Sequence, residues 1–274
     1  MKGLCWLASY PKSGNTWVKL FLEAYKTGKV DINDLNFVVG DEKVYYYQLV
    51  TPVPYHVMDL YGWSVIRPAA LHNVMLFNQA KDQIVVKTHC ANMTVGNIPL
   101  FPQPMSSRSV YMVRNPLDVA PSYARHIDVS VDETIGYMQR ERHGGIPSVE
   151  VLRNFSFMSS WDNHVNSWMA YPDILVVRYE NLVSDPEQWF TKILEQYCIE
   201  VDAKRLQEAM DLTTLDKLIK QEEDNGFLEA THGKFFGAKK EKLTQDQTNA
   251  IIDAFGDIMV KLGYLEAEVK AGAA

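Results

Sequence analysis

The sequence predicts a single α/β domain with a central parallel β-sheet flanked by helices. Four short apolar runs of strand length alternate with longer stretches along the chain. The first run, 4–8, leads through a tight turn into residues with helical apolar spacing. The 274 residues, 47% of them apolar, suffice for one large core. Because no linker, repeat or composition shift divides the chain, we assign one domain to 1–274.

The turn after the first run is suited to binding an anion. A proline ends the strand, and the helix that follows points its first backbone N–H groups at the turn. Lys12, Ser13 and Thr16 add three donors. The common phosphate loop places its lysine after its glycines, whereas Lys12 precedes the single Gly14. The turn therefore predicts a phosphate-like ligand other than ATP, and an ordinary strand–helix connection is the alternative.

The second predicted strand, 83–89, ends in three polar residues, Lys87, Thr88 and His89. Side chains at the carboxyl end of such a strand face the crevice where α/β sheets bind ligands. A lone histidine is more often a packing or surface residue. From the residues alone, His89 is therefore either a site residue or a structural one.

The third and fourth predicted strands, 109–113 and 173–178, both end in arginine. After the third, Asn115 and Pro116 are typical first residues of a helix, so Arg114 either pairs locally or binds an anion. Phosphate-loop kinases and ATPases usually carry an aspartate after one such strand to hold magnesium. Arginine there favours a polyanion that the protein neutralises directly.

Two segments are expected to surround a second ligand. Residues 23–80 form an aromatic, proline-broken stretch that either packs in the core or forms a binding pocket. Residues 129–147 are polar and glycine-rich, and we interpret them as a loop that is either solvated or a lid. The last ten residues, 265–274, are expected to be a disordered tail.

Composition limits the possible partners and compartment. A net charge of −7 argues against non-specific nucleic-acid binding, so any basic pocket is local. Three widely spaced cysteines indicate reduced thiols and a cytoplasmic protein. No Cys or His pair has metal-ligand spacing, so no metal site is expected. With no signal peptide or membrane span in the sequence, no membrane partner is expected. The oligomeric state stays open.

The segment YPKSGNTW, residues 10–17, closely resembles the 5′-phosphosulfate loop of the PAPS-dependent sulfotransferases, usually YPKSGTTW, with Asn15 as the departure. The resemblance implies a soluble member of cytosolic or bacterial type with a fold like that of the phosphate-loop NTPases. It implies PAPS as co-substrate, PAP as product, and no metal. VVKTH at 85–89 resembles the strand end where this family keeps its general base. On that resemblance His89 takes the acceptor's proton, while Lys87 and Lys12 stabilise the transferring group.

Further motifs resemble the family's nucleotide site. RNPLDVAPSY resembles its 3′-phosphate motif, in which Arg114 and Ser122 keep a spacing of eight. The segments at 179–182 and 213–215 resemble those near adenine. The family's Arg-Lys pair is missing near 231–240, although its glycines are present. Lys234, Lys239 or Lys240 is expected to supply the charge instead, with His232 as a weaker candidate. The implied nucleotide-binding residues are Lys12, Ser13, Gly14, Asn15, Thr16, Trp17, Arg114, Ser122, Tyr179, Thr213, Leu215, Gly233 and Lys234.

We therefore expect in-line transfer of a sulfuryl group from PAPS to a hydroxyl, or in second place an amine, of a small acceptor. The aromatic stretch suggests that this acceptor is apolar or aromatic. Two rival hypotheses stay open at this point. One is a kinase-like phosphoryl-transfer enzyme, and the other is a non-catalytic PAP-binding protein that has lost part of its grip on the 3′-phosphate.

Overall fold

The protein is built on a five-stranded, wholly parallel sheet with the order β2-β3-β1-β6-β7. A computed structural model describes residues 3–41, 44–52, 60–141, 157–230, 234–238 and 241–266. The strands are β1 (Leu4–Ser9), β2 (Val39–Gly40), β3 (Ile84–Thr88), β6 (Ser109–Val113) and β7 (Ile174–Arg178). A separate antiparallel pair joins β4 (Thr94–Val95) to β5 (Ile98–Pro99).

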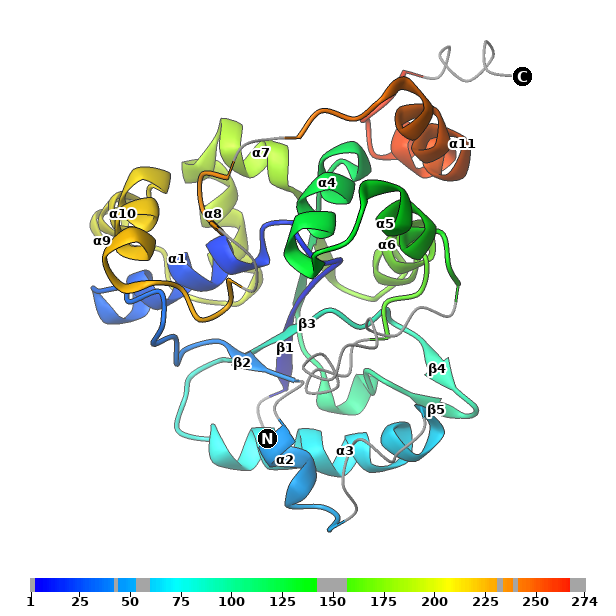
Figure 1. Ribbon diagram of the computed structural model, residues 1–274. Coiled ribbons are helices and arrows are strands. Elements are labelled where there is room, and N and C mark those ends of the chain that lie inside the picture. Colours follow the sequence, from blue (N-terminus) through cyan, green and yellow to red (C-terminus); the bar gives the residue numbers. More distant parts are fainter. Residues whose placement is uncertain are drawn as a thin grey trace.

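Helices cover both faces of the sheet (Figure 1). The helices are α1 (Asn15–Thr27), α2 (Val44–Gln48), α3 (Leu60–Phe77), α4 (Pro116–Ile127), α5 (Val131–Met138), α6 (Trp161–Met169), α7 (Tyr179–Ser184), α8 (Pro186–Gln196), α9 (Ala203–Leu212), α10 (Leu215–Asn225) and α11 (Gln245–Lys261), with a 3₁₀ turn at Gln103–Met105. None of the helices in the described ranges combines the length and the hydropathy that a membrane crossing needs.

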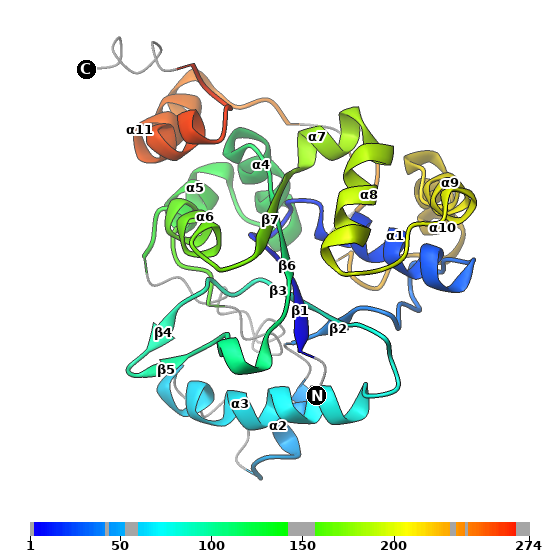
Figure 2. The ribbon, with the colours of Figure 1, turned by 180° about the vertical axis from the view of Figure 1, so that it is seen from behind.

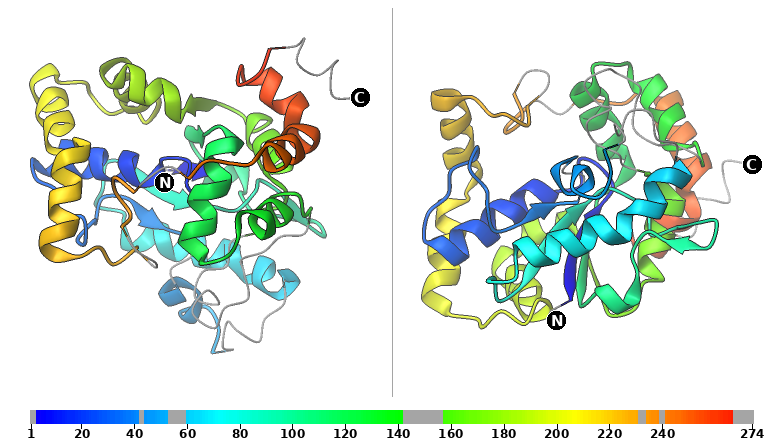
Figure 3. Two further views of the ribbon diagram at one scale, coloured as in Figure 1. Left: turned by 45° about the horizontal axis from the view of Figure 1, so that its top comes forward. Right: turned by 90° about the horizontal axis from the view of Figure 1, so that it is seen from below.

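Alternation along the buried strands divides the core into two layers. Trp6 and Ala8 of β1 pack with α3, α4, α6 and α11, whereas Cys5 and Leu7 pack with α1, α8 and α9. Figures 1 and 2 show α1, α8, α9 and α10 on one side of β1, and α4, α5, α6 and α11 on the other. Both views in Figure 3 also show α10 and α11 on opposite sides of the molecule. A sheet buried on both faces explains why its strands read as continuous apolar runs.

The four strands predicted from sequence are all present, within one or two residues of their expected ends. The predicted helix start after β6 is also confirmed: Asn115 accepts a hydrogen bond from the amide of Leu117, and Pro116 is the first helical residue. The edge strand β2 was not predicted, because two residues carry no readable alternation.

The prediction of a loop across 129–147 is wrong for its first part, which forms α5. The physical reason is a capping box, in which Ser130 accepts from the amide of Glu133 and the glutamate side chain returns to the Ser130 amide. This signature outweighs the polar composition of the segment. Residues 142–147 lie outside the described residues, as do 267–274 of the expected tail.

Within 23–80, Tyr47 and Trp63 pack in the core around a buried arginine, whereas Tyr61 and Phe77 are exposed. Arg67 forms an ion pair of 2.6 Å with Asp41 and donates to the Tyr47 hydroxyl at 2.9 Å and to the Leu100 carbonyl at 2.8 Å. Trp63 lies against its guanidinium. Because the Asp41 amide also donates to the Lys87 carbonyl, this cluster fixes the carboxyl end of β3. Tyr45, Pro54 and Tyr55 lie outside the residues whose side chains are described.

Breaking the buried Arg67–Asp41 ion pair should destabilise the fold strongly. Asp41→Asn leaves a charged guanidinium at 1% exposure without its counter-ion, which typically lowers the free energy of unfolding by ~3–5 kcal/mol. Urea unfolding measures this loss. As a control, Lys204→Ala removes an exposed pair with an N–O distance of 3.8 Å and should change stability by less than ~1 kcal/mol. Equal effects of the two variants would contradict the structural role of Arg67.

Candidate active site

The carboxyl ends of four neighbouring strands, β3, β1, β6 and β7, meet at one edge of the sheet. The register pairs Ala8 with Thr88, Ser9 with Met112, and Val113 with Arg178. The residues that follow these strands therefore lie close together: the turn after β1, His89, Arg114 and Tyr179. Figure 2 shows the starts of α4 and α7 at the same end of the sheet as the turn into α1.

The turn between β1 and α1 is tight enough to require unusual backbone conformations. Lys12 has φ 64° and Gly14 has φ 98°, and the left-handed region costs a non-glycine residue ~1–2 kcal/mol. A Cβ on Gly14 would lie 2.6 Å from the ring of Tyr179. Asn15 ties the turn to β1, because its Nδ2 donates to the Leu7 carbonyl and to the Ser9 hydroxyl, each at 3.1 Å. These two hydrogen bonds explain why an asparagine suits position 15, where the motif usually has threonine.

Polar groups in this turn fit a bound anion. Ser13 Oγ and Arg114 Nε are buried, and neither has a hydrogen-bond partner among the residues that the structure describes. Buried donors without partners are costly, and an anion would satisfy both. Arg114 is held in place by a 3.1 Å hydrogen bond from its Nη1 to the Lys12 carbonyl, and its guanidinium lies 4.6 Å from the Tyr179 ring centroid. The first backbone amides of α1 point toward the same turn.

The electrostatics of Lys12 show that cations gather here. Burial, together with the charges of Arg125, Arg114 and Lys87, lowers the pKa of Lys12 to about 7, while Glu229 opposes the shift. A protein with a net charge of −7 thus has a locally basic pocket. The Lys12 ammonium lies 3.7 Å from the ring centroid of Phe235. The sequence did not indicate Phe235, although the neighbouring Lys234 was expected at the site.

His89 is oriented as a proton acceptor. Its Nδ1 lies 2.8 Å from the Ser9 carbonyl oxygen and 3.3 Å from the Ser9 hydroxyl. Since a carbonyl only accepts, Nδ1 must carry the proton, and the neutral ring keeps its lone pair on Nε2. The histidine is half-buried at the end of β3. The ring is therefore held in the tautomer that a general base needs.

A second histidine supports the first from behind. His164 of α6 is fully buried, donates from Nε2 to the His89 carbonyl at 3.1 Å, and contacts the Tyr111 hydroxyl through Nδ1 at 2.8 Å. Burial lowers the pKa of His164 to about 3, so it stays neutral. Trp161 and Trp168 of the same helix are buried as well.

Trp17, Tyr179 and Thr213, expected beside adenine, lie together. The Trp17 indole donates to the Thr213 carbonyl at 3.1 Å and meets the Tyr179 ring edge-on, with centroids 6.3 Å apart. The Thr213 hydroxyl donates back into its own helix, to Ala209. Leu215 is 56% exposed at the start of α10. Its contact with a base stays a prediction.

The remaining expected residues are less closely connected to the turn. Ser122 is half-buried on α4, the helix that begins two residues after Arg114. Thr16 is half-buried in the first turn of α1. Lys234 is exposed and pairs with Glu223 at 2.6 Å, so its contact with a phosphate stays a prediction. Gly233 lies outside the described residues.

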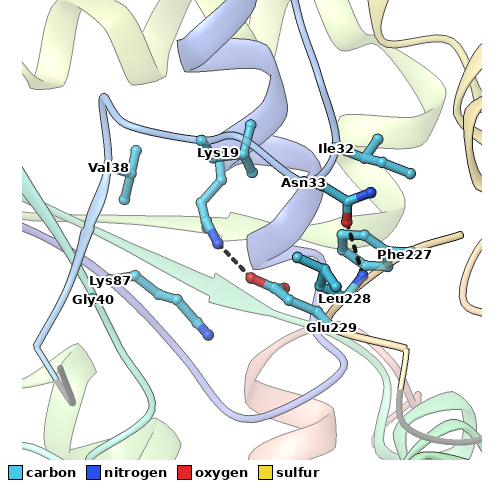
Figure 4. A pocket seen from close by; sticks show the side chains of 10 residues that line it. Lys19, Ile32, Asn33, Val38, Gly40, Lys87, Phe227, Leu228 and Glu229 are labelled. Atoms are coloured by element: carbon cyan, nitrogen blue, oxygen red, sulfur yellow. Dashed lines mark hydrogen bonds and ion pairs between the residues drawn. The ribbon is translucent and has the colours of Figure 1, made fainter. Parts of the chain in front are cut away.

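A cavity of about 260 Å³ opens beside Lys87 (Figure 4). Its charged residues are Lys19, Lys87 and Glu229, and Lys19 pairs with Glu229 at 2.8 Å. Its apolar lining consists of Ile32, Leu35, Val38, Phe227 and Leu228. Ile32, Leu35 and Val38 belong to the 23–80 stretch. The sequence indicated a pocket there because of its aromatic residues, not because of these three aliphatic ones. Among the residues that the structure describes, no cluster of three or more His, Cys, Asp or Glu side chains is arranged to hold a metal ion.

Comparison with known proteins identifies the family. The Sulfotransferase domain model matches residues 3–263. Dog sulfotransferase 1B1 is 26% identical over 241 residues, which is 82% of this chain and 68% of the relative. Cytosolic sulfotransferase 13 of Arabidopsis thaliana is 24% identical over 232 residues, which is 79% of this chain and 62% of the relative.

Solved structures show the same fold. Mouse sulfotransferase SULT7A1, complexed with PAP, superposes with a TM-score of 0.59 at 16% identity, over 94% of this chain and 85% of its own. Retinol dehydratase, complexed with retinol and PAP, superposes with a TM-score of 0.60 at 16% identity, over 94% of this chain and 82% of its own.

The chain belongs to the sulfotransferase family and is accordingly an enzyme that transfers sulfuryl groups. The predicted family, fold class and reaction class are thereby confirmed.

Substitution of Gly14 should disturb the site out of proportion to its size. Gly14→Ala forces a left-handed conformation and places a methyl group 2.6 Å from a carbon of Tyr179, so the turn must shift. We expect PAP affinity, measured by calorimetry, to fall ~10-fold or more, as for the loss of a charge-assisted contact. Gly28→Ala is the matched control: its φ is 72°, but nothing lies within 4 Å of the new methyl. Unchanged affinity in Gly14→Ala would contradict the assigned role of the turn.

Proposed function

We propose that the sulfuryl donor is PAPS and that its phosphates lie against the cation cluster around Lys12. The partnerless donors Ser13 Oγ and Arg114 Nε support this assignment. So do the charges of Lys87, Arg114 and Arg125, which all act on Lys12. Trp17 and Tyr179 would bracket the adenine, with Thr213 holding Trp17 in place. Ser122 would join Arg114 at the 3′-phosphate.

The proposed chemistry uses His89 as general base. Nε2 accepts the proton of the acceptor hydroxyl, the hydroxyl oxygen attacks sulfur, and the bond from sulfur to the 5′-phosphate oxygen breaks, leaving PAP. Such base catalysis is typically worth ~10²–10⁴ in rate. Lys12, Lys87 and the amides of the turn stabilise the charge on the transferring and leaving groups. The observation that carries this role is the hydrogen bond from His89 Nδ1 to the Ser9 carbonyl, because it puts the proton of the neutral ring on Nδ1 and the basic lone pair on Nε2.

We propose a small-molecule acceptor bound beside Lys87, in part by residues of the 23–80 stretch. Retinol dehydratase binds retinol and androsterone in its solved complexes, and an apolar acceptor agrees with the apolar lining of the cavity here.

We place the protein in the cytoplasm. The name of the Arabidopsis relative supports that compartment. So do Cys5, Cys90 and Cys198, which form no disulfide with one another.

The two rivals are less well supported. The family match counts against a phosphoryl-transfer enzyme. A non-catalytic PAP-binding protein would need neither a lysine beside the sulfuryl group nor a histidine fixed in the tautomer of a base. No observation favours it beyond the absent Arg-Lys run.

Two substitutions should separate catalysis from binding. His89→Asn should lower kcat ~10²–10⁴-fold, with PAP affinity within threefold of wild type, because the histidine faces the acceptor. Arg114→Met should instead weaken PAP binding ~10- to 100-fold, through loss of a charged hydrogen-bond donor. Turnover assays with radiolabelled PAPS and calorimetry with PAP measure the two effects. Wild-type turnover in His89→Asn would remove the histidine from the mechanism.

PAP binding should draw a proton onto Lys12. With a pKa of about 7, Lys12 is mostly neutral at pH 8 in the free protein, and a neighbouring phosphate raises that pKa. At pH 8 the phosphates of PAP are fully ionised, so ~1 proton should be taken up per PAP bound. Calorimetry in buffers of different ionisation enthalpy measures the uptake. The Lys12→Arg variant should bind PAP without taking up this proton, since arginine stays protonated. Proton uptake retained in Lys12→Arg would show that another group takes the proton.

A further inference from the structure

The cavity beside Lys87 has a charge arrangement that the transfer chemistry does not use. Lys19 extends from α1 and Glu229 from the segment after α10, and the two meet at 2.8 Å on its wall (Figure 4). The Lys19 side chain is 9% exposed, whereas that of Glu229 is 41% exposed. The carboxylate is therefore the member of the pair that an incoming molecule can reach.

The bound donor changes which charges the acceptor meets. Lys12 and Lys87 are assigned to the phosphosulfate end of the donor, which brings several negative charges to them. Lys19 already has Glu229 as its partner. An anionic acceptor would thus be repelled by the donor's negative charges. The nearby cations would not offset this repulsion, because Lys12 and Lys87 are paired with the donor and Lys19 is paired with Glu229. A cationic group would instead meet the Glu229 carboxylate, which lies close enough to the cluster to raise the pKa of Lys12.

The size of the cavity limits the rest of the acceptor. A cavity of ~150 Å³ holds benzene, so about 260 Å³ accommodates one ring with a short side chain. The apolar lining, which includes Phe227 and Val38, suits such a ring. Asn33 fixes the wall, because its Oδ1 accepts from the Leu228 amide at 2.8 Å and its Nδ2 donates to the Gly226 carbonyl at 3.0 Å.

We propose that Glu229 selects the acceptor, and that the acceptor is a single-ring or similarly small hydroxyl compound carrying a protonated amine. The amine binds the Glu229 carboxylate, and the hydroxyl points toward Lys87 and His89. This inference rests on the proposed function, since it assumes that the donor occupies the Lys12 cluster. It adds the recognition group, which the sequence did not reveal.

Three matched phenols test the proposal: tyramine, the neutral 4-(2-hydroxyethyl)phenol, and the anionic 3-(4-hydroxyphenyl)propanoate. Binding to the enzyme–PAP complex is measured by calorimetry, and kcat/KM is measured with PAPS. Tyramine should be preferred over the neutral phenol ~10-fold or more, as expected for a charge-assisted hydrogen bond, and the anion should be the poorest. Glu229→Gln should remove the preference for tyramine and leave the neutral phenol within threefold.

Matched variants distinguish the possible causes. Glu208→Gln removes an exposed carboxylate on α9 and should leave the preference unchanged. Lys19→Met keeps the carboxylate and should retain the tyramine preference; a loss specific to the anionic phenol would instead assign recognition to Lys19. If PAP binds but Glu229→Gln affects all three phenols equally, or the wild type shows no preference, the proposal is overturned and the proposed function stands. Failure of the wild type to bind PAP overturns both.

Discussion

The repulsion between like charges is the constraint on which the site depends. Lys12 lies half-buried among Lys87, Arg114 and Arg125, with Glu229 as the opposing charge. Burial in the first place, and these neighbouring cations in the second, lower its pKa to about 7. Holding these cations together costs free energy that a bound polyanion would offset. The partnerless donors Ser13 Oγ and Arg114 Nε point to the same conclusion. A cluster of cations and unsatisfied donors is expected in a protein whose ligand is negatively charged.

The parallel sheet is what brings these groups together. Each strand delivers its last residues to one edge, so that a turn near residue 12, a histidine at 89 and an arginine at 114 become neighbours. Fixed contacts then orient them: the Ser9 carbonyl selects the tautomer of His89, and the Lys12 carbonyl holds Arg114. Behind β3, the Arg67–Asp41 cluster and neutral His164 keep the strand end in place.

The parts readable from sequence were those encoded by local patterns. Apolar runs located the buried strands, and Asn115-Pro116 located the start of α4. The start of α5 was equally local, but the polar composition of the segment concealed its Ser130–Glu133 capping box. Phe235 and Glu229 could not have been found in this way. Their contacts with Lys12 and Lys19 span more than 200 positions and depend on how the segment after α10 folds back over α1.

The most direct test of the central claim is the affinity of the protein for PAP compared with adenosine 5′-monophosphate, measured by calorimetry at pH 7.5 without divalent metal. Both ligands offer the adenine and the 5′-phosphate, and only PAP carries the 3′-phosphate that Arg114 is assigned to bind. Tighter binding of PAP by ~10- to 100-fold, the expected worth of charged hydrogen bonds, agrees with the convergence described here. Equal affinities, or no binding of either nucleotide, would contradict it.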